Sequence, residues 1–355
     1  PLNPEMYGNR PTYTPSVDET TDSLAATGGV LDSDNAANPY GDYTQVYVPY
    51  CTGDIHWGSK DTTYFLQEAG GAWTIHHRGA DNLLAVLDWL DKEGKKDGID
   101  LKNASDISVV GASAGAYGAN FAFAAVSERA GDDTSLSLLS DSGVGVIDNP
   151  LPRVMNFYET AIYNPDPSGR DSSWGVVQNV PKAVYEGNCF VTPEDYLANW
   201  AEYSTTSIGP NGLLPSIFAA LSYKFPNARL ATSTPPIDPV QIGFYSLMTT
   251  LNGTPISEGQ ALVEWYCSMV AMVTGVVQSG AAGYTYFIDT YFPVDENNQP
   301  APVGFHTSVF GDVFGQLGFD PFYTAGATGV ALSDWTRALI DGPQLPAPVR
   351  LPLLD

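Results

Sequence analysis

One serine in this 355-residue sequence lies where a nucleophile would be placed. Residues 106–130 read DISVVGASAGAYGANFAFAAVSERA, so Ser113 follows an apolar run and precedes a helix of small residues. Gly111 and Gly115 flank it in a Gly-x-Ser-x-Gly pattern, which permits the tight strand-to-helix bend that exposes a serine hydroxyl. The next backbone N–H then points at a developing oxyanion, so we expect Ala114 to donate one hydrogen bond there. The pattern alone also fits a glycine-rich bend without chemistry.

Serine chemistry requires a base and a carboxylate that orients it, because a serine hydroxyl by itself is a weak nucleophile. Where a Gly-x-Ser-x-Gly bend carries that chemistry, the chain order is serine, acid, histidine. Only His306 follows Ser113, and it lies on a loop after the last predicted strand. The sequence therefore predicts His306 as the base. The three earlier histidines are interpreted as structural or solvated side chains: His56, His76 and His77.

Three aspartates that end predicted strands are candidates for the acid. Asp141 ends the strand after the nucleophile's helix, Asp238 follows a later strand, and Asp289 lies just before the histidine loop. The chain order favours Asp238, which has the usual position of the acid. The residues alone leave Asp141 and Asp289 open as alternatives.

The elements that must position these residues follow from the hydrophobic pattern. Apolar or β-branched runs predict strands, and apolar residues at helical spacing predict helices. Strands are expected at 43–50, 106–113, 135–143, 228–241 (its first part) and 284–292, and a short strand or a loop at 71–79. Helices are expected at 80–94, 114–130, 193–204, 257–280 and 332–342. This alternation predicts a single α/β domain over 1–355, with a mostly parallel sheet and helices on both faces. Residues 148–230 are expected to form a loop and helix cap or lid.

Composition limits the partners of such a domain. Hydrophobic residues make up 43% of the chain, enough for a sizeable core, and 40 acidic against 15 basic residues give a net charge of −25. This charge repels phosphate backbones and acidic lipid head groups, and it suits secretion or a saline habitat. We therefore expect no nucleic-acid partner and a secreted, extracellular or periplasmic location.

No metal motif is present in the sequence. Cys51, Cys189 and Cys267 form no C-x-x-C pair, and the four histidines are not at zinc-ligand spacing with them. No apolar run reaches the ~18 residues that cross a bilayer. The sequence predicts neither a metal nor a cofactor nor membrane insertion, and it leaves the oligomeric state undetermined.

The chain resembles the pectin acetylesterase and Notum family of serine carboxylesterases, whose fold is α/β-hydrolase-like, in six stretches that follow one another in the right order. A single such match would be weak, whereas six in order are strong. The stretches are VYVPYCTGDIHWGS (46–59), HHRGADNLLAVLDWL (76–90), VVGASAGAYGAN (109–120), LLSDSGVGVID (138–148), IDPVQIGFY (237–245) and GFHTSVF (304–310).

Residue by residue, the resemblance implies that the nucleophile is Ser113, the acid Asp238 and the base His306. It implies that Asp141 has a structural role under the site. It also implies hydrolysis of carboxylic esters, such as acetyl esters, through an acyl-serine intermediate without a metal or cofactor. The cysteine-rich habit of the family and the spacing of Cys189 and Cys267 are compatible with a disulfide between them, and the sequence leaves the disulfide pattern undetermined.

The sequence departs from the family pattern in one respect. A glycine-rich segment that donates further oxyanion hydrogen bonds normally precedes the Tyr-Cys motif, and it is not found before Cys51. Loss of one such donor would lower the rate by about 10²–10³-fold. Either upstream strands are missing from this chain or it has lost half of its oxyanion hole. We expect the first, because Cys51 would then be an odd cysteine whose upstream partner is gone.

The acidic surface also bears on the substrate. Pectin is a polyanion, so a neutral acylated polysaccharide fits a protein of this charge better. Trp57, His56 and Tyr117 are candidates for an aromatic substrate platform, although Trp57 and Tyr117 would equally serve for packing. Two alternatives stay open, a polyester or lipid-ester hydrolase and a non-catalytic extracellular binding or structural relative.

Overall fold

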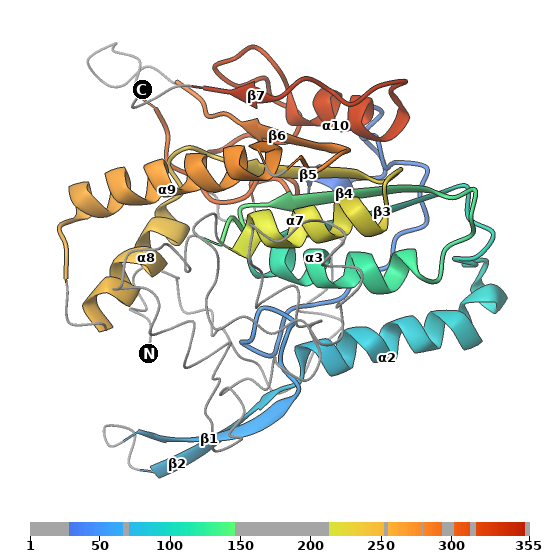
Figure 1. Cartoon of the computed structure of the whole chain (residues 1–355), viewed down its shortest axis with the longest axis horizontal. Coiled ribbons are helices and arrows are strands. Elements are labelled where there is room, and N and C mark those ends of the chain that lie inside the picture. The colour runs from blue at the N-terminus through green and yellow to red at the C-terminus, as the bar shows by residue number, and fades with distance from the viewer. Residues whose placement is uncertain are drawn as a thin grey trace.

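The computed structural model describes residues 28–66, 71–145, 213–251, 255–278, 280–292, 302–312 and 317–351. Within these residues, five parallel strands form one sheet in the order β3-β4-β5-β6-β7 (Figure 1). The strands are β3 (Asp106–Ala112), β4 (Ser135–Asp141), β5 (Arg229–Thr234), β6 (Tyr284–Ile288) and β7 (Val349–Arg350). The prediction of an α/β fold built on a parallel sheet is confirmed.

Helices cover both faces of this sheet. Figure 1 shows α3, α7 and α9 along one side of the strands and α10 on the other. The helices are α2 (Gly79–Lys92), α3 (Ala114–Ser127), α7 (Leu213–Lys224), α8 (Pro239–Leu251), α9 (Glu258–Gln278) and α10 (Leu332–Asp341), with short 3₁₀ turns η1 (Gly29–Leu31) and η2 (Gly94–Asp97). Both faces are therefore buried, as parallel strands require.

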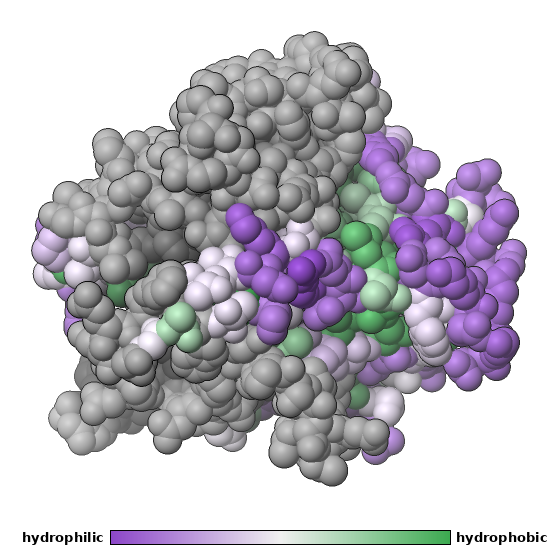
Figure 2. All heavy atoms as spheres, turned by 90° about the horizontal axis from the view of Figure 1, so that it is seen from below, coloured by the Kyte–Doolittle hydropathy of each residue, from purple (hydrophilic) through white to green (hydrophobic). Residues whose placement is uncertain are grey.

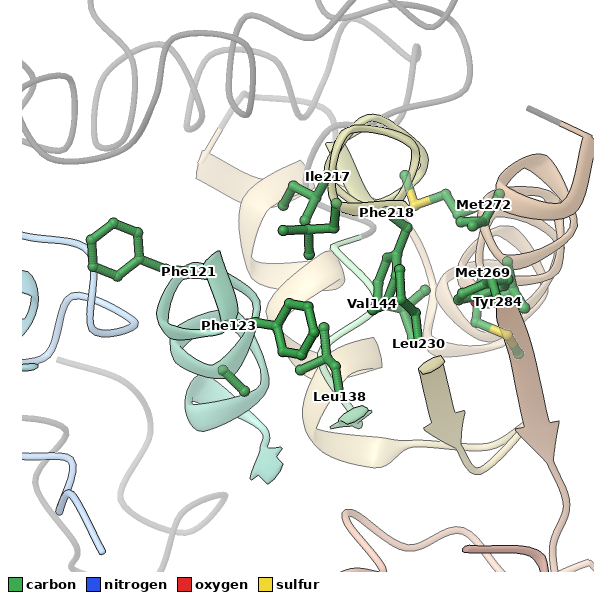
Figure 3. Close-up of a cluster of buried hydrophobic side chains, with 14 of the residues drawn as sticks. Phe121, Phe123, Leu138, Val144, Ile217, Phe218, Leu230, Met269, Met272 and Tyr284 are labelled. Carbon is green, nitrogen blue, oxygen red and sulfur yellow. The ribbon is translucent and has the colours of Figure 1, made fainter. Parts of the chain in front are cut away.

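Alternate strand residues divide the core into two clusters. On β4, Leu138 packs into one cluster and Leu139 into the other, and each side chain is fully buried. Figure 3 shows the first cluster, where side chains of α3, α7 and α9 converge on the sheet. It includes Phe123, Leu138, Phe218, Leu230, Met269 and Tyr284. The second cluster packs α10 against the sheet and includes Leu139, Ala231, Phe287, Trp335 and Leu339.

A hairpin outside the main sheet precedes α2. β1 (Lys60–Leu66) and β2 (Gly71–His77) pair antiparallel, from Lys60 opposite His77 to Leu66 opposite Gly71. It projects from the body of the fold below α2 in Figure 1. The sequence predicted a strand or loop at 71–79 and gave no prediction for its partner.

Two predictions about the elements are wrong. Residues 44–50 form no strand, and Val46 and Tyr47 are 45% and 44% exposed. Strand propensity depends on a neighbour to pair with, and this segment runs over the surface instead. The predicted C-terminal boundary of the 148–230 cap is also wrong, because α7 and β5 belong to the core. Residues 146–212, which include the helix expected at 193–204, lie outside the described residues.

α9 is the one helix in the described part of the chain that is long and apolar enough to span a membrane, by length and hydropathy alone. The helix packs against α7 and α8, and 47% of its apolar stretch is buried inside the fold. We therefore interpret α9 as a core helix.

Figure 2 shows the face seen from below, where hydrophilic residues gather on the side that carries α2 and leave an apolar strip beside them.

Candidate active site

Ser113 lies at the junction of β3 and α3. Its φ of 57° and ψ of −123° are values that a residue with a side chain rarely adopts, so the bend is strained. A Cβ on Gly111 would overlap the carbonyl oxygen of Gly115, which explains the glycine before the serine. The Ser113 N–H donates to the carbonyl of Asp141 at 2.8 Å, and Asp141 also pairs with Ala112 across the sheet. The serine is therefore fixed where two neighbouring strands end.

Ala114 is the first residue of α3. The first N–H groups of an α-helix have no partner within the helix and carry the positive end of its dipole. The Ala114 N–H is thus at the position where a helix best accommodates negative charge. Its role as an oxyanion donor stays a prediction.

The structure brings His306 and Asp238 together, although 68 residues separate them in the chain. The Nδ1 atom of His306 lies 2.8 Å from Oδ2 and 2.9 Å from Oδ1 of Asp238. Both side chains are buried, at 1% and 0% exposure. A carboxylate only accepts hydrogen bonds, so Nδ1 donates and Nε2 is the basic nitrogen of the ring. This is the tautomer that a general base requires.

Asp238 is held in place by the start of α8. Its Oδ1 accepts hydrogen bonds from the N–H groups of Val240 at 3.0 Å and Gln241 at 2.9 Å, as a residue that caps a helix does. Its Oδ2 accepts from Nε2 of Gln241 at 2.8 Å. Oε1 of the same Gln241 accepts from the N–H of Val144, 3.1 Å away, so the glutamine ties the acid to the segment after β4.

The two alternative acids have other partners. Asp141 is fully buried, and its side chain accepts from Ser233 Oγ at 2.6 Å and from the N–H groups of Ser308 at 2.6 Å and Val309 at 3.1 Å. Burial raises the pKa of Asp141, while these hydrogen bonds and the charge of nearby His306 act in the opposite direction.

Asp289 turns toward the loop after β6. It accepts from the N–H groups of Thr290 at 2.8 Å and Thr328 at 3.2 Å, and also from the Thr328 hydroxyl. Of the three aspartates, Asp238 is the one that the structure hydrogen-bonds to the His306 ring.

The 51–59 loop packs against α3 just beyond the serine. Trp57 is fully buried, its Nε1–H donates to the carbonyl of Tyr117 at 2.8 Å, and the two rings meet edge to face. His56 is also buried, and a Cβ on Gly118 would lie 2.8 Å from its ring. Burial lowers the pKa of His56, which favours the neutral imidazole.

These contacts correct the aromatic-platform hypothesis for two of its three residues. Trp57 and His56 fill the space between the loop and α3, so neither ring offers an exposed face for stacking. Tyr117 is half-buried, and its hydroxyl accepts from the N–H of Gly145 at 3.0 Å. The structure therefore gives Trp57 the packing role that the sequence had left open, and a substrate contact by Tyr117 stays a prediction.

A buried carboxylate holds the 51–59 loop in place. Asp54 is fully buried and accepts from the N–H of His56 at 3.1 Å, from the Thr52 hydroxyl, and from the N–H of Gly79 at 2.8 Å, where α2 begins. His77 is buried too, and its Nδ1 lies 3.1 Å from the carbonyl of Thr52. His76 is 59% exposed and lies 3.0 Å from Asp61. These contacts fit the structural roles expected for the early histidines.

The described residues contain no group of three or more His, Cys, Asp or Glu side chains that could hold a metal ion. Cys267 is a free thiol on the exposed side of α9. Cys189 lies outside the described residues.

Sequence reasoning missed the part played by Gln241 and Ser142. An aspartate followed three residues later by glutamine has the spacing of a helix capping box, and this signal was available in IDPVQ. The sequence carries no comparable signal for Ser142. Its hydroxyl accepts from the N–H of Thr307, and a contact between residues so far apart in the chain leaves no local pattern.

A protein-family model described as Pectinacetylesterase matches residues 7–193. The matched range includes Ser113 and ends before Asp238 and His306. No curated protein and no solved structure matches the chain.

Proposed function

This chain belongs to the pectinacetylesterase family, and from that premise we propose that it is a serine carboxylesterase that removes acetyl groups from a polysaccharide. Membership confirms the resemblance found in the sequence and supports an acetyl ester hydrolase. The serine mechanism, its residues and the substrate are parts of the proposal.

The observation that carries the mechanism is the buried His306–Asp238 pair at 2.8 Å. In a parallel sheet all strands end at the same edge, so residues that follow different strands meet there. Ser113 follows β3, Asp238 follows β5 and His306 follows β6. A nucleophile, an acid and a base thus come from three separate elements at one edge.

The proposed reaction has two steps. Ser113 Oγ attacks the ester carbonyl while His306 Nε2 takes the hydroxyl proton, and Asp238 stabilises the resulting imidazolium. The Ala114 N–H stabilises the oxyanion, the C–O bond to the sugar breaks, and His306 returns the proton to the departing alcohol. Water activated by His306 then attacks the acyl-serine, which releases acetate and regenerates the serine.

Ser113→Ala tests the nucleophile. The variant should lose turnover of a chromogenic acetyl ester and labelling by a fluorophosphonate, and peptide mapping of the wild type should locate the label on Ser113. Ser105→Ala is a matched control, because Ser105 is an exposed serine just before the opposite end of β3. Labelling that survives in Ser113→Ala, or turnover lost equally in both variants, would contradict the proposal.

We propose a neutral acylated polysaccharide as the substrate because the chain carries a net charge of −25. Repulsion of a polyanion extends about 30 Å at 0.01 M salt and about 8 Å at 0.15 M. Deacetylation of a polygalacturonate should therefore accelerate as salt rises over this range, whereas deacetylation of acetylated xylan should change little. Faster reaction on the polygalacturonate at low salt would contradict this assignment, and preference for long acyl chains would indicate a lipid-ester hydrolase.

A secreted location follows from the same proposal. Structural polysaccharides of cell walls lie outside the cytoplasm, and the acidic composition suits an extracellular protein. Fractionation of the source cells should recover the protein in the medium or the periplasm, and its recovery from the cytosol would contradict the proposal.

A further inference from the structure

Strained backbone gathers around the candidate site. Five non-glycine residues in the described ranges have positive φ, and three of them are Ser113, Ser142 and Thr307, at 57°, 55° and 66°. Such conformations persist only where the surrounding structure holds them, and they are concentrated at functional sites. The hydrogen bonds that hold these three residues therefore bear on function.

Those hydrogen bonds converge on Asp141 and Ser142 at the end of β4. The carbonyl of Asp141 accepts from the N–H of Ser113 at 2.8 Å. The hydroxyl of Ser142 accepts from the N–H of Thr307 at 3.1 Å. One carboxylate oxygen of Asp141, Oδ2, accepts from the next two N–H groups, those of Ser308 and Val309. Two adjacent residues thus contact both the serine bend and the loop that carries His306.

The position of Asp141 is itself fixed. Its other oxygen accepts from Ser233 Oγ at 2.6 Å, and the N–H of Ser142 donates to the carbonyl of Ser233 at 2.8 Å. The carboxylate is fully buried, so water does not compete for these hydrogen bonds.

We propose that Asp141 is a positioning residue for the esterase reaction: its carbonyl fixes the backbone of Ser113, and its carboxylate fixes the loop of His306. This inference rests on the proposed function. One residue thereby sets the geometry between nucleophile and base, which come from distant parts of the chain.

Asp289 provides a matched comparison. It is also a buried aspartate where a strand ends, and its carboxylate also accepts two backbone N–H groups and a hydroxyl. Its donors belong to Thr290 and Thr328, whereas those of Asp141 include the N–H groups directly after His306 and Thr307. A purely structural role for Asp141 would make Asp141→Ala and Asp289→Ala equivalent in their effect on activity.

The test compares kcat, KM and thermal midpoint for both alanine variants. A displacement of about 1 Å between reacting groups lowers the rate by about 100-fold. Asp141→Ala should therefore lower kcat about 100-fold with KM changed less than about 3-fold, since it removes no group that binds the ester. Asp289→Ala should lower the midpoint similarly and keep kcat within about 3-fold of wild type.

Asp141→Asn should rescue activity. The amide oxygen can accept from both N–H groups of the histidine loop while the amide nitrogen donates to Ser233 Oγ, which has acceptor capacity. We expect at least about one tenth of the wild-type kcat, because the hydrogen bonds that position the loop are kept. Equal activity losses in Asp141→Ala and Asp289→Ala, or an Asp141→Asn variant as inactive as Asp141→Ala, would overturn the proposal.

Two measurements keep the test decisive. If Asp141→Ala does not fold, Ser142→Gly is tested in its place. Glycine tolerates the positive φ at this position, and the substitution removes the hydroxyl that accepts from the N–H of Thr307. The kcat of this variant should fall, and an unchanged kcat would overturn the inference. Hydrogen exchange of the 307–309 amides needs no ester. Faster exchange in Asp141→Asn than in Asp289→Ala would overturn the positioning role, whereas a wild type without turnover would contradict the proposed function alone.

Discussion

Replacement of Asp238 by asparagine removes one charge and keeps the shape of the side chain. In the wild type every partner of this carboxylate is a donor: His306 Nδ1, the N–H groups of Val240 and Gln241, and Nε2 of Gln241. An asparagine has only one acceptor atom, so its NH₂ group must face at least one of these donors.

The conflict has no local solution. If the amide nitrogen takes the place of Oδ2, it meets Nε2 of Gln241. Rotation of the Gln241 amide would remove that clash but would turn Nε2 toward the N–H of Val144, which now donates to Oε1. If the amide nitrogen takes the place of Oδ1, it meets the two N–H groups at the start of α8. Each buried donor left unpaired costs about 1–3 kcal/mol.

The effect on the reaction is larger than the effect on stability. Without the carboxylate, His306 loses the group that selects its tautomer and stabilises its protonated form. In serine triads the equivalent change lowers kcat by about 10⁴-fold, which corresponds to about 5.4 kcal/mol of barrier. We expect a loss of this order in Asp238→Asn, with the protein still folded.

The assay is kcat on a chromogenic acetyl ester at pH 7, with circular dichroism to establish folding. Asp289→Asn is the control, because Asp289 is buried at a strand end and does not contact His306. A folded Asp238→Asn variant with kcat within tenfold of wild type would refute the reasoning, and an equal loss in the control would show that the effect is not specific to the pair.

Three further predictions concern the surroundings of the site. Gln241→Ala should lower kcat about tenfold with little change in KM, because Asp238 loses one of its orienting hydrogen bonds; unchanged kcat would count against this role. Trp57→Phe should lower the unfolding free energy by about 1–3 kcal/mol in urea denaturation, since the fully buried side chain loses volume and its hydrogen bond to the carbonyl of Tyr117; an unchanged midpoint would contradict this. Burial lowers the pKa of His56 below its unfolded value of about 6.5, so its contribution to stability is present above that pH and is lost on acidification. The urea concentration at the unfolding midpoint should therefore fall less between pH 7 and pH 5 in His56→Gln than in the wild type. An equal fall in both proteins would contradict this.

Local pattern was sufficient where neighbouring residues decide the conformation. The strand, bend and helix around Ser113 follow from an apolar run, two glycines and a stretch of small residues, and β3 and α3 occupy nearly the predicted ranges. α2 likewise follows from leucines at helical spacing, three of which are buried. The chain order was enough to select His306, because no other histidine follows the serine.

Pairing between distant residues could not be read in this way. The 43–50 segment has strand propensity, yet residues 44–50 form no strand and Val46 and Tyr47 are exposed. The aromatic side chain of Trp57 was a candidate for stacking on a ligand. Only the packing of its loop on α3 shows that the indole is buried. Propensity describes what a segment is able to form, and tertiary contacts decide which form is stabilised.

The same division holds for the site. The sequence by itself determined the bend that presents Ser113, the single histidine after it and three aspartates able to serve as the acid. Only the tertiary structure decided that the Asp238 carboxylate meets the imidazole, while Asp141 turns to the backbone of the histidine loop. The reason is geometric: a parallel sheet gathers the ends of all its strands at one edge, and the loops that leave each strand determine which side chains touch there.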